Sequence, residues 1–182
     1  SEGDQLSEDE LDSMTFLLMF AGFETTTNLI AGSVVGLDQN PDQRAWLFED
    51  FDNRIETATE ELCRYVSSIT GIKPRIASKD IVIDGRLIKK GEKVMALPVA
   101  ANFDPAVFDQ PDKLRLDRFP NPHLAFSTGT HFCLGMQLAR VELQEALRAL
   151  YMRHPNLSVS EPATFAKRPG HRAITKLNVN LA

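Results

Sequence analysis

The residue of this chain best suited to chemistry is Cys133, which lies on a short loop bracketed by glycines. It belongs to the stretch Phe126-Ser-Thr-Gly129-Thr-His131-Phe-Cys133-Leu-Gly135, and a strongly helical segment follows at once. Free N–H groups and the positive end of the helix dipole stabilise a sulfur anion at a helix N-terminus. Glycines also let a flat partner lie close to the main chain. The loop therefore suits a thiolate that binds a ligand or a metal.

Cys133 alone leaves several interpretations open. A lone cysteine is most often a small buried apolar side chain, and it can also be a reactive thiol or share a zinc site with His131. Zinc usually takes four ligands at recognisable spacing, and the only other cysteine, Cys63, has no paired motif around it. A thiolate held in this way also suits a haem iron, because it pushes electron density onto the metal and favours O–O bond cleavage.

A second candidate motif, residues 21–27, interrupts a long apolar helical pattern with Ala-Gly-Phe-Glu-Thr-Thr-Thr. Glycine and three β-branched hydroxyl residues are poor choices for the middle of a helix. Their cost indicates a kink, a close approach to a ligand, or hydroxyls that face a pocket. An acid beside an alcohol, as in Glu24-Thr25, can relay protons to bound oxygen through water. The alternative, favoured for the motif alone, is a kinked core helix whose threonines bond back to the preceding turn.

Charged residues form a third group of candidates. Glu61 and Arg64 are three residues apart on an expected helix and share one face. Such pairs are usually solvated salt bridges on the surface that contribute little to stability. The functional alternative is a buried pair, completed by Arg118, that fixes an irregular loop. Arg75 and His131 would neutralise the propionates of a haem. Considered singly, each of these two is an ordinary surface residue.

Composition restricts the class of protein. The chain of 182 residues is long enough for one domain with a real core, so we expect a single domain over residues 1–182. Its net charge of −5, with both signs interspersed, argues against a nucleic-acid-binding protein. No apolar run is long enough to span a membrane. Two cysteines make no disulfide framework, so a reducing, cytoplasmic compartment is expected.

The elements that must position these residues are mainly helical, so the expected fold class is α+β with a majority of helix. Ser7 and Glu10 are placed as a capping box at the start of the first helix. Helices are expected over residues 11–37, 41–49, 54–67 and 134–154. Short strands are expected within residues 74–97, with tight turns at Asp84-Gly85 and Lys90-Gly91, and within residues 173–179.

A proline-rich stretch leads to the cysteine loop, and an apolar helical pattern follows it. Residues 102–133 contain four prolines and little periodicity, which indicates an irregular loop, either ordered or disordered. After Cys133, apolar residues recur at a near-helical spacing with polar residues between them, which predicts the last helix. They are Leu134, Leu138, Val141, Ala146 (or Glu145) and Leu150.

In order and spacing, these motifs resemble the cytochrome P450 superfamily, the haem-thiolate monooxygenases. Residues 21–26 are similar to the oxygen-activation motif of its distal helix, Glu61-x-x-Arg64 is similar to its Glu-x-x-Arg pair, and residues 126–135 are similar to its haem-binding signature. The histidine at 131 and the acidic composition resemble bacterial members. Family members are more than twice as long, and this chain resembles their C-terminal half. The implied fold is a long distal helix, the Glu-x-x-Arg helix, a small β-sheet, a meander, the cysteine loop and a proximal helix.

The resemblance also implies a site. Cys133 would be the axial ligand of a haem b iron, and Glu24 with Thr25 would relay protons to iron-bound oxygen. Glu61, Arg64 and Arg118 would be structural. The residues implied to bind the cofactor are Cys133, His131, Arg75, Phe126, Gly129, Gly135, Ala21 and Gly22. Residues 69–72 and the region of Gly170 would face the substrate.

The implied function is insertion of one oxygen atom from O2 into a small organic substrate, with electrons from NAD(P)H through a ferredoxin or flavodoxin-type partner. The partner would dock over the cysteine side, where Lys113, Arg115 and Arg140 offer cations. The alternative is a non-catalytic truncated fragment with weak or no haem binding, which acts at most as an interaction module. This alternative arises because half a fold leaves the haem and much of the core open to water.

Three positions depart from the pattern of the bacterial members. Ser127 stands where glycine is usual, and Ser67-Ser68 lacks the proline usual after the Glu-x-x-Arg helix. Phe103 replaces an arginine that is usual in the meander, so a contact there is expected to be lost.

Overall fold

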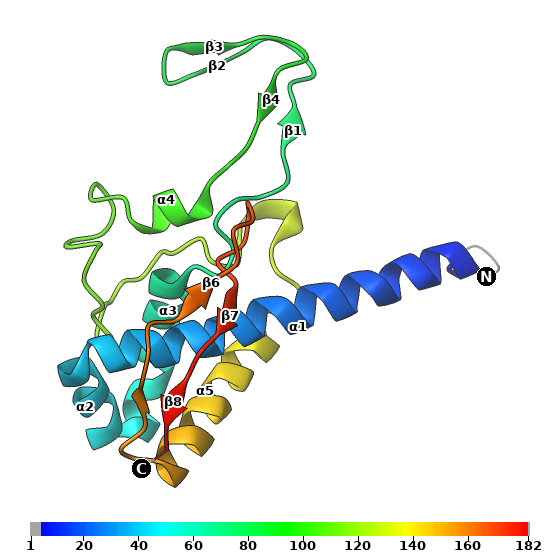
Figure 1. The fold of residues 1–182 in the computed structure, drawn as a ribbon. Coiled ribbons are helices and arrows are strands. Elements are labelled where there is room, and N and C mark those ends of the chain that lie inside the picture. The colour runs from blue at the N-terminus through cyan, green and yellow to red at the C-terminus, as the bar shows by residue number, and fades with distance from the viewer. Residues whose placement is uncertain (1–4, 182) are drawn as a thin grey trace.

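Four long helices surround the core, and the first of them extends well beyond it (Figure 1). The computed structural model describes residues 5–181. The helices are α1 (Glu8–Gln39), α2 (Pro41–Glu49), α3 (Phe51–Val66) and α5 (Met136–Arg153). They confirm the four expected helices. α1 begins at the expected capping box, which forms: Glu10 N–H donates to Ser7 Oγ at 3.3 Å, and Ser7 N–H donates to Glu10 Oε2 at 2.9 Å.

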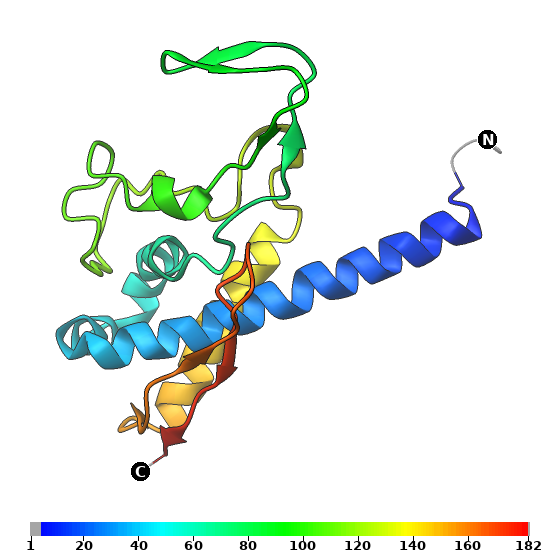
Figure 2. The same cartoon turned by 45° about the horizontal axis from the view of Figure 1, so that its top comes forward.

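The core lies where these helices pack together. α1 crosses α5 and also packs on α2 and α3 (Figures 1 and 2). Leucines from all four helices are fully buried, and each such side chain contributes about 1.5–3 kcal/mol of transfer free energy. They are Leu37, Leu47, Leu62, Leu143 and Leu147. Leu116, from the irregular stretch, is equally buried among them, so that stretch is part of the core.

Strands within the described residues form four antiparallel pairs. β1 (Arg75–Ile76) pairs with β4 (Lys93–Val94), and β2 (Ile81–Ile83) pairs with β3 (Arg86–Ile88). Near the C-terminus, β5 (Ser158–Val159) pairs with β8 (Val179–Asn180), and β6 (Thr164–Phe165) pairs with β7 (Ile174–Lys176). The expected turn at Asp84-Gly85 closes the β2–β3 hairpin with φ values of 48° and 73°, as a type I′ turn requires. This hairpin projects away from the helices (Figures 1 and 2).

The stretch expected to be irregular follows a defined path and contains two short elements that the sequence pattern did not predict. These are α4 (Pro98–Asn102) at its start and the 3-10 turn η1 (Gly129–His131) near its end. Both are too short to produce a readable apolar period.

The apolar spacing that predicted α5 does not mark its buried face. Leu134, Leu138 and Val141 are 93%, 62% and 54% exposed, and the residues that face the core are Leu143, Leu147 and Tyr151. At 3.6 residues per turn, Leu138 lies about 140° around the helix from Leu143, on the opposite side. Apolar residues lie on both sides of this helix, so the spacing predicts a helix but does not show which side meets the core.

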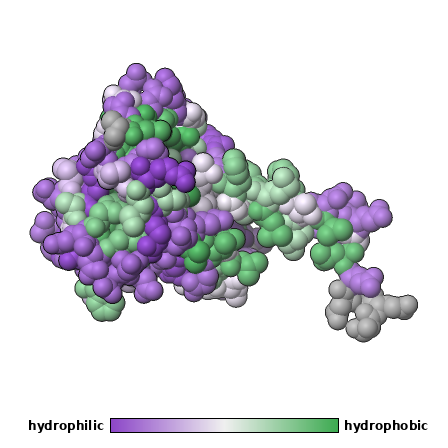
Figure 3. All heavy atoms as spheres, turned by 90° about the horizontal axis from the view of Figure 1, so that it is seen from below, coloured by the Kyte–Doolittle hydropathy of each residue, from purple (hydrophilic) through white to green (hydrophobic). Residues whose placement is uncertain are grey.

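α1 is divided into a packed half and a bare half. Its buried residues begin at Thr26 and continue to Leu37. Earlier in the helix, a run of large apolar side chains is exposed, and Figure 3 shows them gathered on the projecting part. They are Leu11, Met14, Phe16, Leu17, Leu18, Met19, Phe20 and Phe23. Among residues 5–181, no helix has both the length and the apolar character needed to cross a membrane.

Candidate functional site

The cysteine loop is held by its own backbone. Cys133 N–H donates to the carbonyl of Phe126 at 3.0 Å, and the carbonyl of Cys133 accepts the N–H of Met136, the first residue of α5, at 3.4 Å. The turn needs left-handed backbone at Gly129, with φ +76°, and at Ser127, with φ +62°. Cys133 therefore stands just ahead of the N-terminus of α5, where backbone N–H groups favour a sulfur anion.

The two cysteines lie in very different environments. Cys133 is a partly exposed free thiol, whereas Cys63 is buried in α3. Burial, with a smaller effect of the Glu60 charge, raises the pKa of the Cys63 thiol to about 12. Cys63 is therefore the inert, apolar cysteine of the chain. Within residues 5–181, no three His, Cys, Asp or Glu side chains cluster in a way that suits a metal ion, so the zinc interpretation of Cys133 with His131 gains no support.

The surroundings of Cys133 fit a flat apolar group. A Cβ added at Gly129 or Gly135 would meet no atom within 4 Å, so open space lies beside the loop. The loop also exposes apolar surface at Phe132, which is 48% exposed, and at Leu134. A single sulfur ligand beside open space and apolar side chains suits a haem iron better than zinc, which usually takes four ligands.

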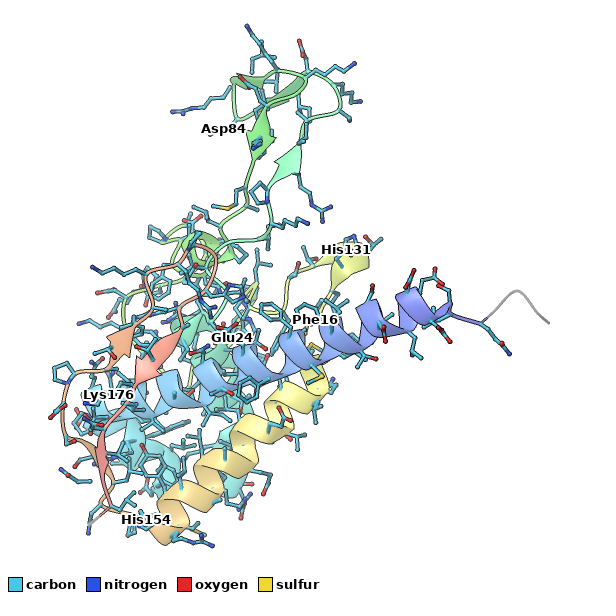
Figure 4. The ribbon with its side chains drawn as sticks, turned by 45° about the vertical axis from the view of Figure 1, so that its right-hand side comes forward. Phe16, Glu24, Asp84, His131, His154 and Lys176 are labelled. Atoms are coloured by element: carbon cyan, nitrogen blue, oxygen red, sulfur yellow. The ribbon has the colours of Figure 1, made fainter. Side chains whose placement is uncertain are left out.

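The second wall of the expected pocket is α1. Ala21 is exposed, and a Cβ added at Gly22 would meet no atom within 4 Å. Figure 4 shows Phe16 and Glu24 along α1 and His131 on the loop that precedes α5. α1 packs against α5, the helix that the cysteine loop precedes.

The Glu24-Thr25 pair is engaged in local contacts. Thr25 Oγ1 donates to the carbonyl of Ala21 at 2.6 Å, and Thr27 Oγ1 donates to that of Phe23 at 2.7 Å. The threonines thus bond back to the preceding turn, and α1 is continuous through the motif. The carboxylate of Glu24 forms an ion pair with Arg168, which lies between β6 and β7. The sequence alone contained no signal for this partner, because 144 positions separate the two residues.

Arg75 and His131, the expected propionate-binding residues, are both exposed. Arg75 lies in β1, and His131 lies in η1. In the part of the chain that the structure describes, neither side chain has a carboxylate partner, so both side chains face solvent.

Glu61, Arg64 and Arg118 are brought together in the interior. Arg64 donates from Nε to Glu61 Oε2 at 2.7 Å and from Nη2 to Oε1 at 2.8 Å, and Arg118 donates from Nε to Oε2 at 3.0 Å. The Glu61 and Arg64 side chains have no exposed surface. The solvated surface bridge is therefore excluded. Two further donors reach this carboxylate and were missed by sequence reasoning: Arg115 N–H at 2.9 Å and Asn121 Nδ2 at 3.0 Å.

The two arginines also bind the irregular stretch. The remaining N–H groups of Arg64 donate to the carbonyls of Asn102, Pro111 and Lys113, at 2.7, 2.8 and 3.1 Å. Arg118 donates to three carbonyls in residues 109–113. Carbonyls of a loop thus satisfy buried guanidinium groups, which explains why a stretch without secondary structure keeps a defined path.

Two of the unusual positions make local contacts. The guanidinium of Arg64 lies over the ring of Phe103, 5.3 Å from the ring centroid, so Phe103 forms a cation–π contact within the meander. Ser67, with φ +44°, ends α3; its hydroxyl donates to the carbonyl of Arg64 at 2.6 Å and accepts from Asn102 Nδ2 at 3.0 Å.

Residues 69–72 and the region of Gly170, both expected to face substrate, are adjacent. Thr70 N–H donates to the carbonyl of Gly170 at 3.0 Å, and Ile69 forms a β-bridge with His171. Gly170 has φ +85°, and an added Cβ would lie 3.3 Å from the carbonyl oxygen of Gly71. A glycine is therefore required where these two segments meet.

Known proteins resemble this chain along almost its whole length. Residues 1–161 match the family described as Cytochrome P450. A biotin biosynthesis cytochrome P450 of Bacillus subtilis is 46% identical over 180 residues, which are 98% of this chain and 45% of that protein. A steroid C26-monooxygenase of Mycolicibacterium smegmatis is 39% identical over 170 residues, which are 93% of this chain and 42% of that protein.

Solved structures agree in fold. The crystal structure of P450BioI in complex with acyl carrier protein ligated to hexadec-9Z-enoic acid matches with a TM-score of 0.94 and 44% identity, over 100% of this chain and 47% of that chain. The cytochrome P450 PksS of Bacillus subtilis also matches with a TM-score of 0.94, at 37% identity. The expected fold class, α+β and mainly α-helical, is confirmed. The chain spans about half the length of the relatives that it matches.

Proposed function

We propose that this chain, which belongs to the cytochrome P450 family, is the cofactor-binding part of a haem-thiolate monooxygenase with Cys133 as the axial ligand of haem b. The observation that carries the proposal is the loop geometry. The partly exposed thiol of Cys133 lies just ahead of the N-terminus of α5. The backbone N–H of Cys133 donates to the carbonyl of Phe126, and open space lies beside Gly129 and Gly135. Haem bound there would supply the binding and reductive activation of O2.

In this proposal the residues of the loop hold and orient the cofactor. Gly129 and Gly135 permit its close approach, and the Phe126 carbonyl holds the backbone of Cys133. Arg75 and His131 would bind the propionates, since both side chains are exposed and have no carboxylate partner within the described residues. Ala21 and Gly22 leave room on the opposite side, where α1 presents small side chains.

Glu24 and Thr25 are proposed to hold and move protons on the α1 side. The Thr25 hydroxyl proton is engaged by the carbonyl of Ala21, which leaves the lone pairs of Oγ1 to accept from a water. Glu24 is paired with Arg168. To pass a proton toward Thr25, its carboxylate must exchange Arg168 for water, so the ion pair controls when the acid takes part.

The cluster of Glu61, Arg64 and Arg118 is proposed to act as a scaffold, because it binds the irregular stretch that leads to the cysteine loop. We propose that residues 1–182 form a single unit of a larger cytochrome P450 domain. The whole protein would insert one oxygen atom into a small organic substrate, with electrons from a ferredoxin or flavodoxin-type donor.

Among the cations expected to meet that donor, Arg140 is bound to Glu60 at two distances of 2.7 Å, so its charge is already neutralised. Arg115 is 3.4 Å from Asp109 and 3.6 Å from Asp117, whereas Lys113 is exposed. The cationic contribution of this face is therefore smaller than the sequence indicates.

A haem titration of the 182-residue chain tests the proposal. We expect a stable Soret band and, after reduction with carbon monoxide present, the absorption band that marks thiolate ligation. Cys133→Ser should remove that band, and the matched control Cys63→Ser should keep it. A Cys133→Ser variant that retained the thiolate band would overturn the assignment of the ligand.

The second candidate is the non-catalytic fragment, which the exposed apolar run on α1 favours. Eight large apolar side chains from Leu11 to Phe23 are exposed in the described structure, and a patch of this kind is typical of a surface that meets another protein segment. A chain that folds but gives no stable Soret band would support this candidate for the isolated chain.

A further inference from the structure

A second carboxylate on α3, next to the buried Glu61, connects three separate parts of the molecule. Glu60 accepts from Arg140 of α5, with Nε to Oε1 and Nη2 to Oε2 both at 2.7 Å. Its Oε2 also lies 3.2 Å from Nε2 of His123, in the irregular stretch. The Arg140 and Glu60 side chains are 23% and 29% exposed, so water screens this cluster only in part.

The hydrogen bonds around His123 show that its ring donates to Glu60. The N–H of Ala125 donates to Nδ1 of His123 at 3.2 Å, so Nδ1 accepts and the ring proton lies on Nε2. His123 therefore donates to Glu60. Burial alone would raise the pKa of Glu60, but hydrogen bonds from His123 and Arg140, together with the Arg140 charge, lower it to about 2. The carboxylate thus stays ionised and accepts from both partners at neutral pH.

Both partners of Glu60 also contact Phe126. The Arg140 guanidinium lies over its ring, 5.0 Å from the centroid, and the His123 ring lies at 5.8 Å with an interplanar angle of 53°. Phe126 itself packs against the core. Its ring is therefore enclosed by a cation, an imidazole and the core, and little freedom remains for it.

Phe126 is in turn the residue that holds the cysteine. Its carbonyl accepts the N–H of Cys133 at 3.0 Å. A continuous set of contacts thus runs from α3, through Glu60 and Arg140, to Phe126 and Cys133.

We propose that Glu60, Arg140 and His123 are positioning residues, which fix Phe126 and through it the position of the Cys133 sulfur relative to α5. This inference rests on the proposed function, because the place of the sulfur matters when it is a metal ligand. None of the three residues touches the cofactor in this proposal. They act through Phe126.

The chain contains a matched control for this cluster. Arg148, two turns further along α5, donates from Nη2 to Asp52 of α3 at 2.8 Å and lies over the ring of Phe51 at 4.7 Å. Its chemistry is the same: an α5 arginine pairs with an α3 acid and stacks on an aromatic ring. Phe51, however, has no part in the cysteine loop, so Arg148 links the two helices without reaching Cys133.

Amide hydrogen exchange of the haem-free 182-residue chain tests the proposal independently of haem binding. In Arg140→Gln and in Glu60→Gln, we expect the Cys133 amide to exchange about tenfold faster, because the residue that accepts its hydrogen bond is released. Arg148→Gln should leave that amide unchanged. Equal exchange at Cys133 in wild type and Arg140→Gln, or an equal rise in Arg148→Gln, would overturn the proposal.

Two further variants keep the test decisive. If Arg140→Gln does not fold, His123→Gln preserves the Glu60–Arg140 pair and should still speed exchange at Cys133. Arg140→Lys retains the charge but loses the two parallel hydrogen bonds to Glu60 and the stacking on the Phe126 ring. The Cys133 amide of this variant should therefore exchange at a rate between those of wild type and Arg140→Gln. Full protection in both variants would contradict the inference.

The haem-loaded chain provides a spectroscopic readout. Arg140→Gln should lose part of the thiolate band of the reduced carbon monoxide complex, and Arg148→Gln should keep all of it. If the wild-type chain binds no haem, the proposed function fails for the isolated chain, while the exchange measurement still decides on the positioning residues.

Discussion

Glu61→Gln is the substitution for which the structure predicts the largest loss of stability. The Glu61 carboxylate accepts five hydrogen bonds: Oε1 from Arg64 Nη2 and Arg115 N–H, and Oε2 from Arg64 Nε, Arg118 Nε and Asn121 Nδ2. A glutamine has one acceptor oxygen, so it retains at most three of the five, and its NH2 group faces other donors. Two guanidinium groups in the interior also lose their counter-charge.

The size of the effect follows from burial. Removing one partner of a fully buried pair costs about 3–5 kcal/mol, because the remaining charge is left uncompensated. Total stabilities of small domains are about 5–15 kcal/mol, so this is a large fraction. For a chain of this size, each kcal/mol lowers Tm by about 2–4 °C, which predicts a decrease of about 6–20 °C.

Urea and thermal unfolding followed by circular dichroism measure this loss. Asp52→Asn is the control: it removes the acid of an arginine–carboxylate pair between α3 and α5 whose Asp52 side chain is 78% exposed, and we expect no measurable change. A loss in Glu61→Gln of less than about 1 kcal/mol would refute the reasoning, because it would mean that the cluster contributes no more than a surface pair.

Three further predictions concern the loop and its support. Ser127→Gly should stabilise the chain by about 1 kcal/mol, because Ser127 adopts φ +62°; unfolding in urea measures it, and a destabilised variant would contradict the strain argument. Glu60 has a pKa of about 2 against an ordinary 4.5, so its contribution to stability is present above pH 4.5 and is lost as pH falls toward 2. Stability measured against pH should therefore be flatter in Glu60→Gln across that window, and an identical slope in both chains would disprove the linkage. In the native chain at pH 8, iodoacetamide should modify Cys133 and spare Cys63, whose pKa is about 12; mass spectrometry should find one adduct, and a second adduct before unfolding would count against the burial of Cys63.

Local patterns were enough to predict most elements and the motif residues. The capping box at Ser7, the turn at Asp84-Gly85 and the four helices depend on neighbours within one or two turns, and each was found where it was expected. The apolar spacing of α5 predicted the helix but not the side that meets the core. Leu138 and Leu143 lie on different sides of α5, and the packing of α1 and α3 on α5 determines that Leu143 is buried.

Contacts between distant residues lay beyond any local pattern. Glu60 meets Arg140 across 80 positions, and Asn121 reaches Glu61 across 60. No spacing rule connects such pairs, because the distance between them is set by how whole helices pack. For the same reason, the sequence did not predict that Arg168 pairs with Glu24, and Arg140 was expected to be a free surface cation.

The sequence by itself determined the family, the ligand candidate Cys133 and the local backbone of its loop, because these depend on residue types at short, fixed spacing. Only the tertiary structure decided which charges are buried, which face of α5 meets the core and which residues support the loop. Burial and ion pairing depend on the path of the chain through space. A carboxylate such as Glu61 is a minor surface residue in water and becomes a central structural one when two guanidinium groups and a loop close around it.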